Sequence, residues 1–138
     1  EGYRRALRDA GIEYDDRLVY VAGSTIDEGM KAGTEFLDEK SDATAVQCVN
    51  DLVAVGAGNV FLNQGLRIPD DLSLAGYGNI LTSEHFRVPL TTVRQPKFRL
   101  GAQAMEVMQA MLRHEQVRNR LLSAELAIRR STGPVPKK

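Results

Sequence analysis

Short apolar runs rich in β-branched residues alternate along this chain with longer segments whose apolar positions recur at helical spacing. Runs of the first kind are typical of buried β-strands, and the second spacing is typical of amphipathic α-helices. Strands are predicted at 17–22, 45–49, 72–75, 90–94 and 122–129, and helices at 1–10, 25–39, 51–64 and 97–114. This alternation favours parallel βαβ units, so we expect an α/β fold in which helices cover both faces of a parallel-sheet lobe.

Local signals mark several boundaries between these elements. Gly11 is expected to end the first helix, because glycine readily adopts the left-handed conformation that closes a helix. Thr25 and Glu28 have the spacing of a capping box, in which each side chain bonds to a free amide of the first turn. Residues 77–89 show no regular pattern and are expected to form a long irregular connection.

Two of the predicted strands end in polar or glycine-bearing corners. Strand 45–49 leads into Asn50, and strand 72–75 leads into Gly76, Tyr77, Gly78 and Asn79. In an open α/β sheet, ligands bind at the carboxyl ends of the strands, so these corners predict a small-molecule site. Two interpretations of the asparagine at the first corner stay open and can coexist, because its amide both donates and accepts. It can cap the helix that follows, which contributes about 1 kcal/mol, or bind a ligand directly.

Other kinds of site find little support in the sequence. A dinucleotide fingerprint would need a third glycine where Leu81 stands and a helix directly after the strand, and residues 80–83 show no helical pattern. His85 and His114 lack metal-ligand spacing to cysteine or carboxylate residues. We find no nucleophile with a base beside it. The sequence therefore predicts neither an enzyme nor a cofactor, metal-ligand or catalytic residue.

The helix predicted over 51–64 carries no charge between residues 52 and 62 and is apolar around nearly its full circumference. A helix of this kind is covered on all sides. One face must cover its own sheet, and we expect the other to meet a second copy of the chain. The residues predicted for this homodimer interface are Leu52, Val53, Ala57, Val60 and Phe61. The alternative is that the rest of the same chain covers this helix.

The composition of the chain argues against nucleic acid and membrane as its direct partners. The chain has 18 basic and 18 acidic residues and no net charge at pH 7, which argues against a nucleic-acid-binding surface of its own. No apolar run approaches the roughly 20 residues that cross a bilayer, so no membrane contact is expected. The single cysteine, Cys48, excludes a disulfide framework and permits a cytoplasmic setting. Because the chain opens in a helical pattern without an initiator methionine, we expect further sequence to precede it.

Several motifs occur in a characteristic order over residues 2–132. They are Ala10-Gly11-Ile12, Val49-Asn50-Asp51 followed by Ala54 and Gly56, GLRIPDDLS at 65–73, Gly76-Tyr77, PLTTVRQP at 89–96, and Arg129-Arg130-Ser131-Thr132. In this order and spacing they resemble the effector-binding region of LacI/GalR-type bacterial transcriptional regulators. The resemblance covers nearly the whole chain.

The resemblance implies a two-lobed fold similar to periplasmic sugar-binding proteins, with the effector in the cleft between the lobes. Residues 1–89 would form the C-terminal lobe without its first strand, and 90–118 the crossover and a helix of the N-terminal lobe. Residues 119–132 would return to the C-terminal lobe, and 133–138 would be a disordered tail. A strand expected before residue 1 would lie between strands 17–22 and 45–49, supplied by further sequence or a partner chain. Direct pairing of those two strands would contradict this hypothesis.

The resemblance also implies a function. The chain would be the effector-sensing and dimerising portion of a cytoplasmic repressor, which binds operator DNA only through an N-terminal helix-turn-helix absent from this chain. Binding of a small molecule in the cleft, a sugar or derivative, would control DNA binding allosterically. The alternative is a solute-binding protein of a sugar transporter on the same fold.

Carried over residue by residue, the resemblance extends the ligand site. Asn50 matches an asparagine that contacts the effector, and Ser24 lies near a position where several members stack an aromatic ring. Gly78 stands where an aspartate commonly binds sugar hydroxyls or a base, and Asn79 follows it. Gln95, in the crossing segment, completes the predicted ligand-binding set with Tyr77.

Overall fold

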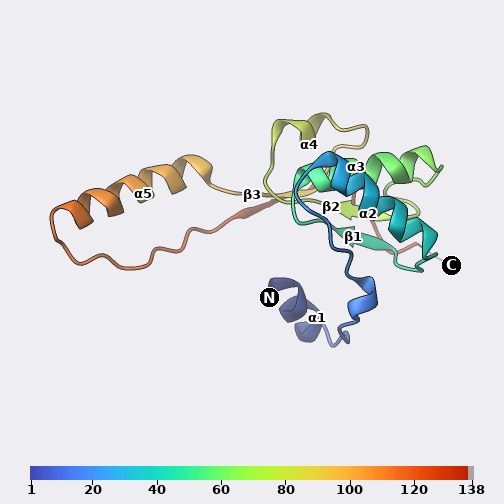
Figure 1. Ribbon diagram of the computed structural model, residues 1–138, viewed down its shortest axis with the longest axis horizontal. Coiled ribbons are helices and arrows are strands. Elements are labelled where there is room, and N and C mark those ends of the chain that lie inside the picture. Colours follow the sequence, from blue (N-terminus) through green and yellow to red (C-terminus); the bar gives the residue numbers. More distant parts are fainter. Residues whose placement is uncertain (137–138) are drawn as a thin grey trace.

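The computed structural model describes residues 1–136, and its helices and strands alternate along the chain (Figure 1). The helices are α1 (Gly2–Asp9), the 3-10 turn η1 (Asp16–Leu18), α2 (Ile26–Asp38), α3 (Asp51–Asn63), α4 (Leu81–His85) and α5 (Lys97–Leu112). The strands are β1 (Ala45–Gln47), β2 (Ser73–Ala75), β3 (Thr92–Arg94) and β4 (Glu125–Ala127). The predicted α/β fold with a parallel sheet is confirmed.

The sheet is built around one parallel βαβ unit. β1 and β2 pair in parallel with Ala45 opposite Ser73, and α3 is the crossover between them. A parallel bridge between Ala75 and Thr91 adds the start of the crossing segment beside β2. β3 and β4 then pair in antiparallel fashion and leave the body of the molecule together.

The core lies between this sheet and the pair of helices α2 and α3. Phe61, Leu72, Leu74 and Leu90 are fully buried there. Each such side chain contributes about 1.5–3 kcal/mol by leaving water. The capping box at Thr25 forms as predicted, with the Glu28 amide donating to Thr25 Oγ1 and the Glu28 carboxylate accepting from the Thr25 amide.

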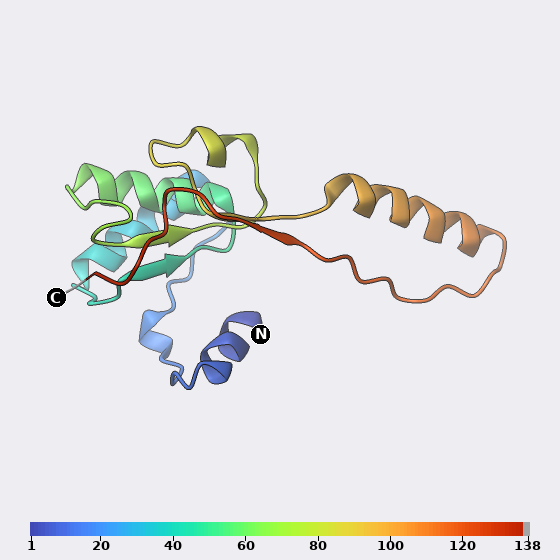
Figure 2. The same cartoon turned by 180° about the vertical axis from the view of Figure 1, so that it is seen from behind.

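Strands β3 and β4, which we call the crossing strands, form with α5 and residues 113–124 an arm that projects away from this core in both views (Figures 1 and 2). None of the residues of α5 is buried, and Phe98 is 90% exposed. Arg120, in the returning segment, binds Gln103 and Glu106 and so holds it beside α5. The apolar face of α5 has no partner among residues 1–136, so its placement in a second lobe stays a prediction.

The strand predicted at 17–22 is wrong. Asp15 accepts hydrogen bonds from the Arg17 amide and guanidinium, which closes the 3-10 turn η1 instead. The residues after η1 are extended at Val19 but pair with no strand in the described part of the chain. An extended segment becomes a strand only through hydrogen bonds to a neighbour, which no local pattern supplies.

A groove of about 760 Å³ lies between this extended segment and the open edge of β1. Its walls are mostly apolar and include Tyr3, Leu7, Val19, Tyr20, Val46 and Cys48. Segments 17–22 and 45–49 are therefore not paired with each other, as the hypothesis of an intervening strand requires. That hypothesis stays a prediction.

The connection over 77–89 is more regular than predicted, because it contains the short helix α4. The Ser83 hydroxyl and amide both donate to the Ile80 carbonyl, and the Leu90 amide donates to the Ser83 carbonyl. Ser83 is fully buried, so tertiary burial rather than an apolar repeat stabilises this turn of helix. The expectation that no helix follows residue 80 was wrong.

The dimer interface predicted on α3 is wrong for three of its five residues. Val53, Ala57 and Phe61 are 4%, 3% and 1% exposed within a single chain, so a second copy cannot reach them. The helix α2 covers this face, as the alternative interpretation required. Leu52 and Val60 are half-buried, and an interface at these two residues stays a prediction.

The close approach of α2 and α3 depends on glycine. A Cβ added at Gly33 would lie 2.9 Å from the Ala57 Cα, and one added at Gly56 would lie 2.8 Å from the Met30 amide nitrogen. These residues therefore let one helix of the chain pack against another, where the sequence suggested contact between two chains.

The end of the described chain returns to the sheet. The Gly133 amide donates to Ser73 Oγ over 3.1 Å, so the first residue of the predicted disordered tail contacts β2. Residues 137 and 138 of that tail lie outside the described residues.

Candidate functional site

The two strand-end corners lie together, as their positions in a parallel sheet predict. α3 begins directly after Asn50, and the Asp51 amide donates to the Tyr77 carbonyl over 3.1 Å. The carboxyl end of β1 is thereby bonded to the loop that follows β2. The six predicted ligand residues gather around this junction, which we call the effector corner after the site predicted there: residues 76–80 with Asn50.

Asn50 caps α3 and also reaches a distant loop. Its Oδ1 accepts from the Val53 amide over 2.8 Å, and its Nδ2 donates to the Ser24 carbonyl over 3.1 Å. The capping interpretation is confirmed, and the second bond brings Ser24 to the corner. One Nδ2 hydrogen is left over from these two bonds, and direct contact with a ligand stays a prediction.

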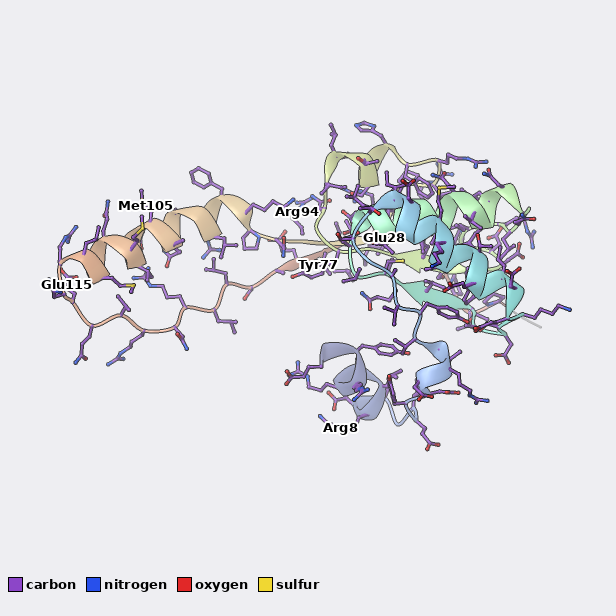
Figure 3. The ribbon with its side chains drawn as sticks, viewed as in Figure 1. Arg8, Glu28, Tyr77, Arg94, Met105 and Glu115 are labelled. Atoms are coloured by element: carbon purple, nitrogen blue, oxygen red, sulfur yellow. The ribbon has the colours of Figure 1, made fainter. Side chains whose placement is uncertain are left out.

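Tyr77 and Gln95 are brought together by a hydrogen bond. Gln95 Nε2 donates to the Tyr77 hydroxyl over 3.1 Å, which leaves the hydroxyl hydrogen available to a ligand. The Tyr77 side chain is 39% exposed and also lines one end of the groove beside β1. Figure 3 shows Tyr77 and Arg94 at the junction between the body and the arm.

Gly78 and Asn79 turn the backbone sharply at the corner. Both lie in the left-handed region, with φ of 125° and 48°, and asparagine is among the residues that tolerate it. The Gly78 amide donates to the Val93 carbonyl over 3.0 Å, and the Asn79 amide to Thr92 Oγ1 over 3.3 Å. The corner therefore rests directly on strand β3.

Asp51 supports the corner from below, a role that the sequence did not predict. It is 1% exposed, accepts from the Thr92 hydroxyl over 2.5 Å, and accepts from the Ile80 amide over 2.9 Å. A carboxylate in the first turn of α3 is also favoured by the helix dipole. An acidic residue directly after a capping asparagine was the one sequence feature that could have pointed to this role. The partners of Asp51 lie 29 and 41 residues away, so the sequence did not identify them.

Arg129 is a second residue at the corner that the sequence did not predict. Its Nη1 donates to the Leu90 carbonyl over 2.9 Å and its Nη2 to Asn79 Oδ1 over 2.8 Å. Glu84 lies 3.8 Å from the same Nη2, and the Arg129 side chain is 14% exposed. The motif at 129–132 marked this residue, but nothing in the motif indicated that its side chain faces the corner.

Two carboxylates at the corner, those of Glu28 and Asp51, accept hydrogen bonds from donors of the chain itself. Glu28 Oε2 accepts from the Thr25 hydroxyl and from the amides of Thr25 and Ser24, and these bonds lower the pKa of Glu28. Both oxygens of Asp51 are likewise engaged. With a glycine at residue 78, the corner offers mainly amide and hydroxyl groups to a ligand.

The described residues hold no cluster of metal-ligating side chains, and their one thiol is buried. Among residues 1–136, no group of three or more His, Cys, Asp and Glu could hold a metal ion. Burial raises the pKa of the Cys48 thiol to about 12, so it stays protonated and a poor nucleophile at neutral pH. Over the same residues, no helix is both long and apolar enough to cross a membrane.

Known proteins match this chain over nearly its full length. The model of the periplasmic binding protein-like domain family matches residues 1–132. The transcriptional repressor CytR of Escherichia coli strain K12 is 37% identical over 138 residues, which are 99% of this chain and 40% of CytR. The chain thus spans less than half the length of this relative.

Solved structures give the same picture. The complex of the transcriptional regulator CelR with cellobiose has a TM-score of 0.86 at 36% identity, over 94% of this chain and 40% of that one. The lac repressor dimer bound to operator and an anti-inducer has a TM-score of 0.85 at 26% identity, over 95% and 46%. The parallel sheet, the crossing strands and these likenesses together show that the chain belongs to the periplasmic binding protein-like domain family, in the branch formed by the LacI-type regulators.

Proposed function

We propose that this chain is the effector-sensing portion of a LacI-type transcriptional repressor. In this proposal a small molecule, a sugar or derivative, binds at the effector corner in a cleft closed by a second lobe. The observation that carries it is the meeting of two strand ends and the crossing strands at one corner, joined by the bonds from Asp51 to Tyr77 and from Gly78 to Val93.

The rest of the proposed protein follows from its relatives. Operator DNA would be bound by a helix-turn-helix that this chain does not contain, so the full-length protein would act in the cytoplasm as a homodimer. Leu52 and Val60 are the half-buried residues of α3 that we propose for the dimer contact. We do not favour a transport receptor, because CytR is a repressor and CelR a transcriptional regulator.

Ligand binding at the effector corner can be tested with the full-length protein. We expect one class among sugars, sugar acids, nucleosides and nucleobases, screened by thermal shift and calorimetry, to bind. Asn50→Asp preserves a good cap for α3 but removes both amide hydrogens, including the one bonded to the Ser24 carbonyl, so it should weaken binding at least about tenfold while α3 stays capped. Asn119→Asp, on the exposed arm, is the matched control.

Two results would count against the proposal. Failure of every class in the screen to bind would remove the sensing function. Binding that Asn50→Asp and Asn119→Asp leave equally unchanged would place the ligand elsewhere.

A further inference from the structure

Asn79 is held on two sides by groups that belong to the crossing strands. Arg129, just after β4, donates to its Oδ1 over 2.8 Å, and Thr92, in β3, accepts from its amide over 3.3 Å. The Asn79 side chain has a broad choice of orientations when free. Here the guanidinium fixes which way the amide points.

The same guanidinium reaches past Asn79 to the start of the crossing segment. Its Nη1 donates to the Leu90 carbonyl over 2.9 Å, and the Arg129 amide donates to Thr91 Oγ1 over 2.9 Å. The planar guanidinium of Arg129, which follows β4, therefore joins the residue range that leads into β3 to the effector corner, and the Arg129 main-chain amide adds a second bond to that range. A lysine has a single nitrogen on a flexible stem and cannot reproduce this geometry.

Main-chain bonds and a buried acid reinforce this bridge. The Gly76 amide donates to the Thr91 carbonyl over 2.9 Å, and the Gly78 amide to the Val93 carbonyl over 3.0 Å. Beneath them, Asp51 binds both Thr92 and Ile80. A movement of the corner away from the crossing strands would break several bonds at once and leave buried polar groups without partners, which is costly.

We propose that Arg129 is a positioning residue of the effector corner, which orients Asn79 and makes the corner and the crossing strands open as one unit. The proposal rests on the proposed function, because it assigns the corner to effector binding. With Oδ1 occupied by Arg129, Asn79 meets a ligand as a donor through Nδ2. Displacement of the corner by a ligand is then passed directly to the strands that lead to the other lobe.

Hydrogen exchange of the full-length protein tests this role without a ligand. Arg129→Met removes the guanidinium and keeps a long side chain. We expect exchange to quicken at least about tenfold in both 76–80 and 90–94, while α2 stays protected. The adjacent, exposed Arg130 supplies the matched control Arg130→Met, which should change neither segment.

Substitutions of Asn79, the partner of Arg129, distinguish a loss of the Arg129–Asn79 bond from a general loss of stability. Asn79→Asp keeps an oxygen for Arg129 and should keep both segments protected. Asn79→Gly removes that oxygen, suits the positive φ, and should reproduce the effect of Arg129→Met. If Arg129→Met does not fold, the comparison of Asn79→Gly with Asn79→Asp decides the question in the same way.

Three results would overturn the proposal: faster exchange in only one of the two segments, an equal rise in α2, or no difference between Arg129→Met and Arg130→Met. The outcome is independent of the ligand screen. If the screen finds no effector and residues 76–80 and 90–94 still respond together, the proposed function fails, but the role of Arg129 in joining the two segments stands. If an effector binds and the two segments respond separately, only the proposed role of Arg129 fails.

Discussion

Single side chains at the strand ends each serve two parts of the fold. Asn50 caps α3 and binds the Ser24 carbonyl, and Asp51 binds Thr92 in β3 and the Ile80 amide. A substitution at either residue is therefore felt in more than one element. The sequence predicted Asn50 as a site residue because its position after a strand is visible locally, whereas the partners of Asp51 are not.

The buried position of Asp51 predicts a large effect on stability. We expect Asp51→Asn to lower the free energy of unfolding of the full-length protein by about 1–3 kcal/mol, because one of two satisfied acceptors becomes a donor. Urea unfolding measures this change. The control is Asp70→Asn, because Asp70 is an exposed aspartate in the turn before β2. This substitution should change the free energy of unfolding by no more than about 0.5 kcal/mol. Equal effects of the two substitutions would contradict the assignment.

The Arg67–Asp71 pair predicts a specific pH dependence. Hydrogen bonds from the Arg67 guanidinium and amide lower the pKa of Asp71 to about 2 from 3.8. A lowered folded-state pKa means that the pair's contribution to stability is present above pH 3.8 and is lost as the pH falls toward 2. NMR titration of the Asp71 carboxyl should show this midpoint, and Arg67→Met should raise it. An unchanged midpoint would show that Arg67 is not the cause.

Among the elements, α2 and α3 behave as one packed unit. The uncharged sequence of α3 indicated a helix with little solvent-facing surface, but not that α2 of the same chain covers the face of Val53, Ala57 and Phe61. By contrast, α5 has an apolar face with no cover in the described residues, although its helical spacing was predicted correctly. Spacing thus identifies a helix with an apolar face, and only packing shows what meets that face.

Two glycine-to-alanine substitutions should have opposite effects. Gly56→Ala forces a methyl group toward the backbone of α2 and should destabilise the protein by about 1–3 kcal/mol. Gly101→Ala, in α5, has no atom within 4 Å of the new Cβ and should stabilise that helix by up to about 1 kcal/mol. Thermal or urea unfolding of the full-length protein compares them. A stabilising Gly56→Ala would contradict the close packing of α2 against α3.

At the scale of the whole molecule, one edge of β1 is unpaired among residues 1–136. The groove beside it is lined by apolar side chains and bounded by an extended segment that pairs with no described strand. An edge of this kind offers unpaired amides and carbonyls to another strand. This arrangement fits the hypothesis that sequence outside the 138 residues supplies the neighbour of β1.

This hypothesis predicts a difference between the 138-residue chain and the full-length protein. We expect amide exchange in β1 to slow at least about tenfold in the longer protein, because a new strand pairs with its open edge. The buried helix α3, covered in the chain itself, serves as the internal reference. Equal exchange of β1 in both proteins would show that no strand fills the groove.

The sequence alone predicted the α/β pattern, most helix boundaries, the capping box and the two corners at the strand ends. These features depend on residues that are close in sequence, because periodicity and capping act within a few residues. The pairing of Arg129 with Asn79 and of Asp51 with Thr92 joins residues 50 and 41 positions apart, and no local pattern encodes such distances. The same reason explains the strand wrongly predicted at 17–22 and the cover of α3. A segment becomes a strand only if folding brings another strand beside it. Likewise, an apolar helix face becomes a contact within the chain or between chains according to what folding places against it.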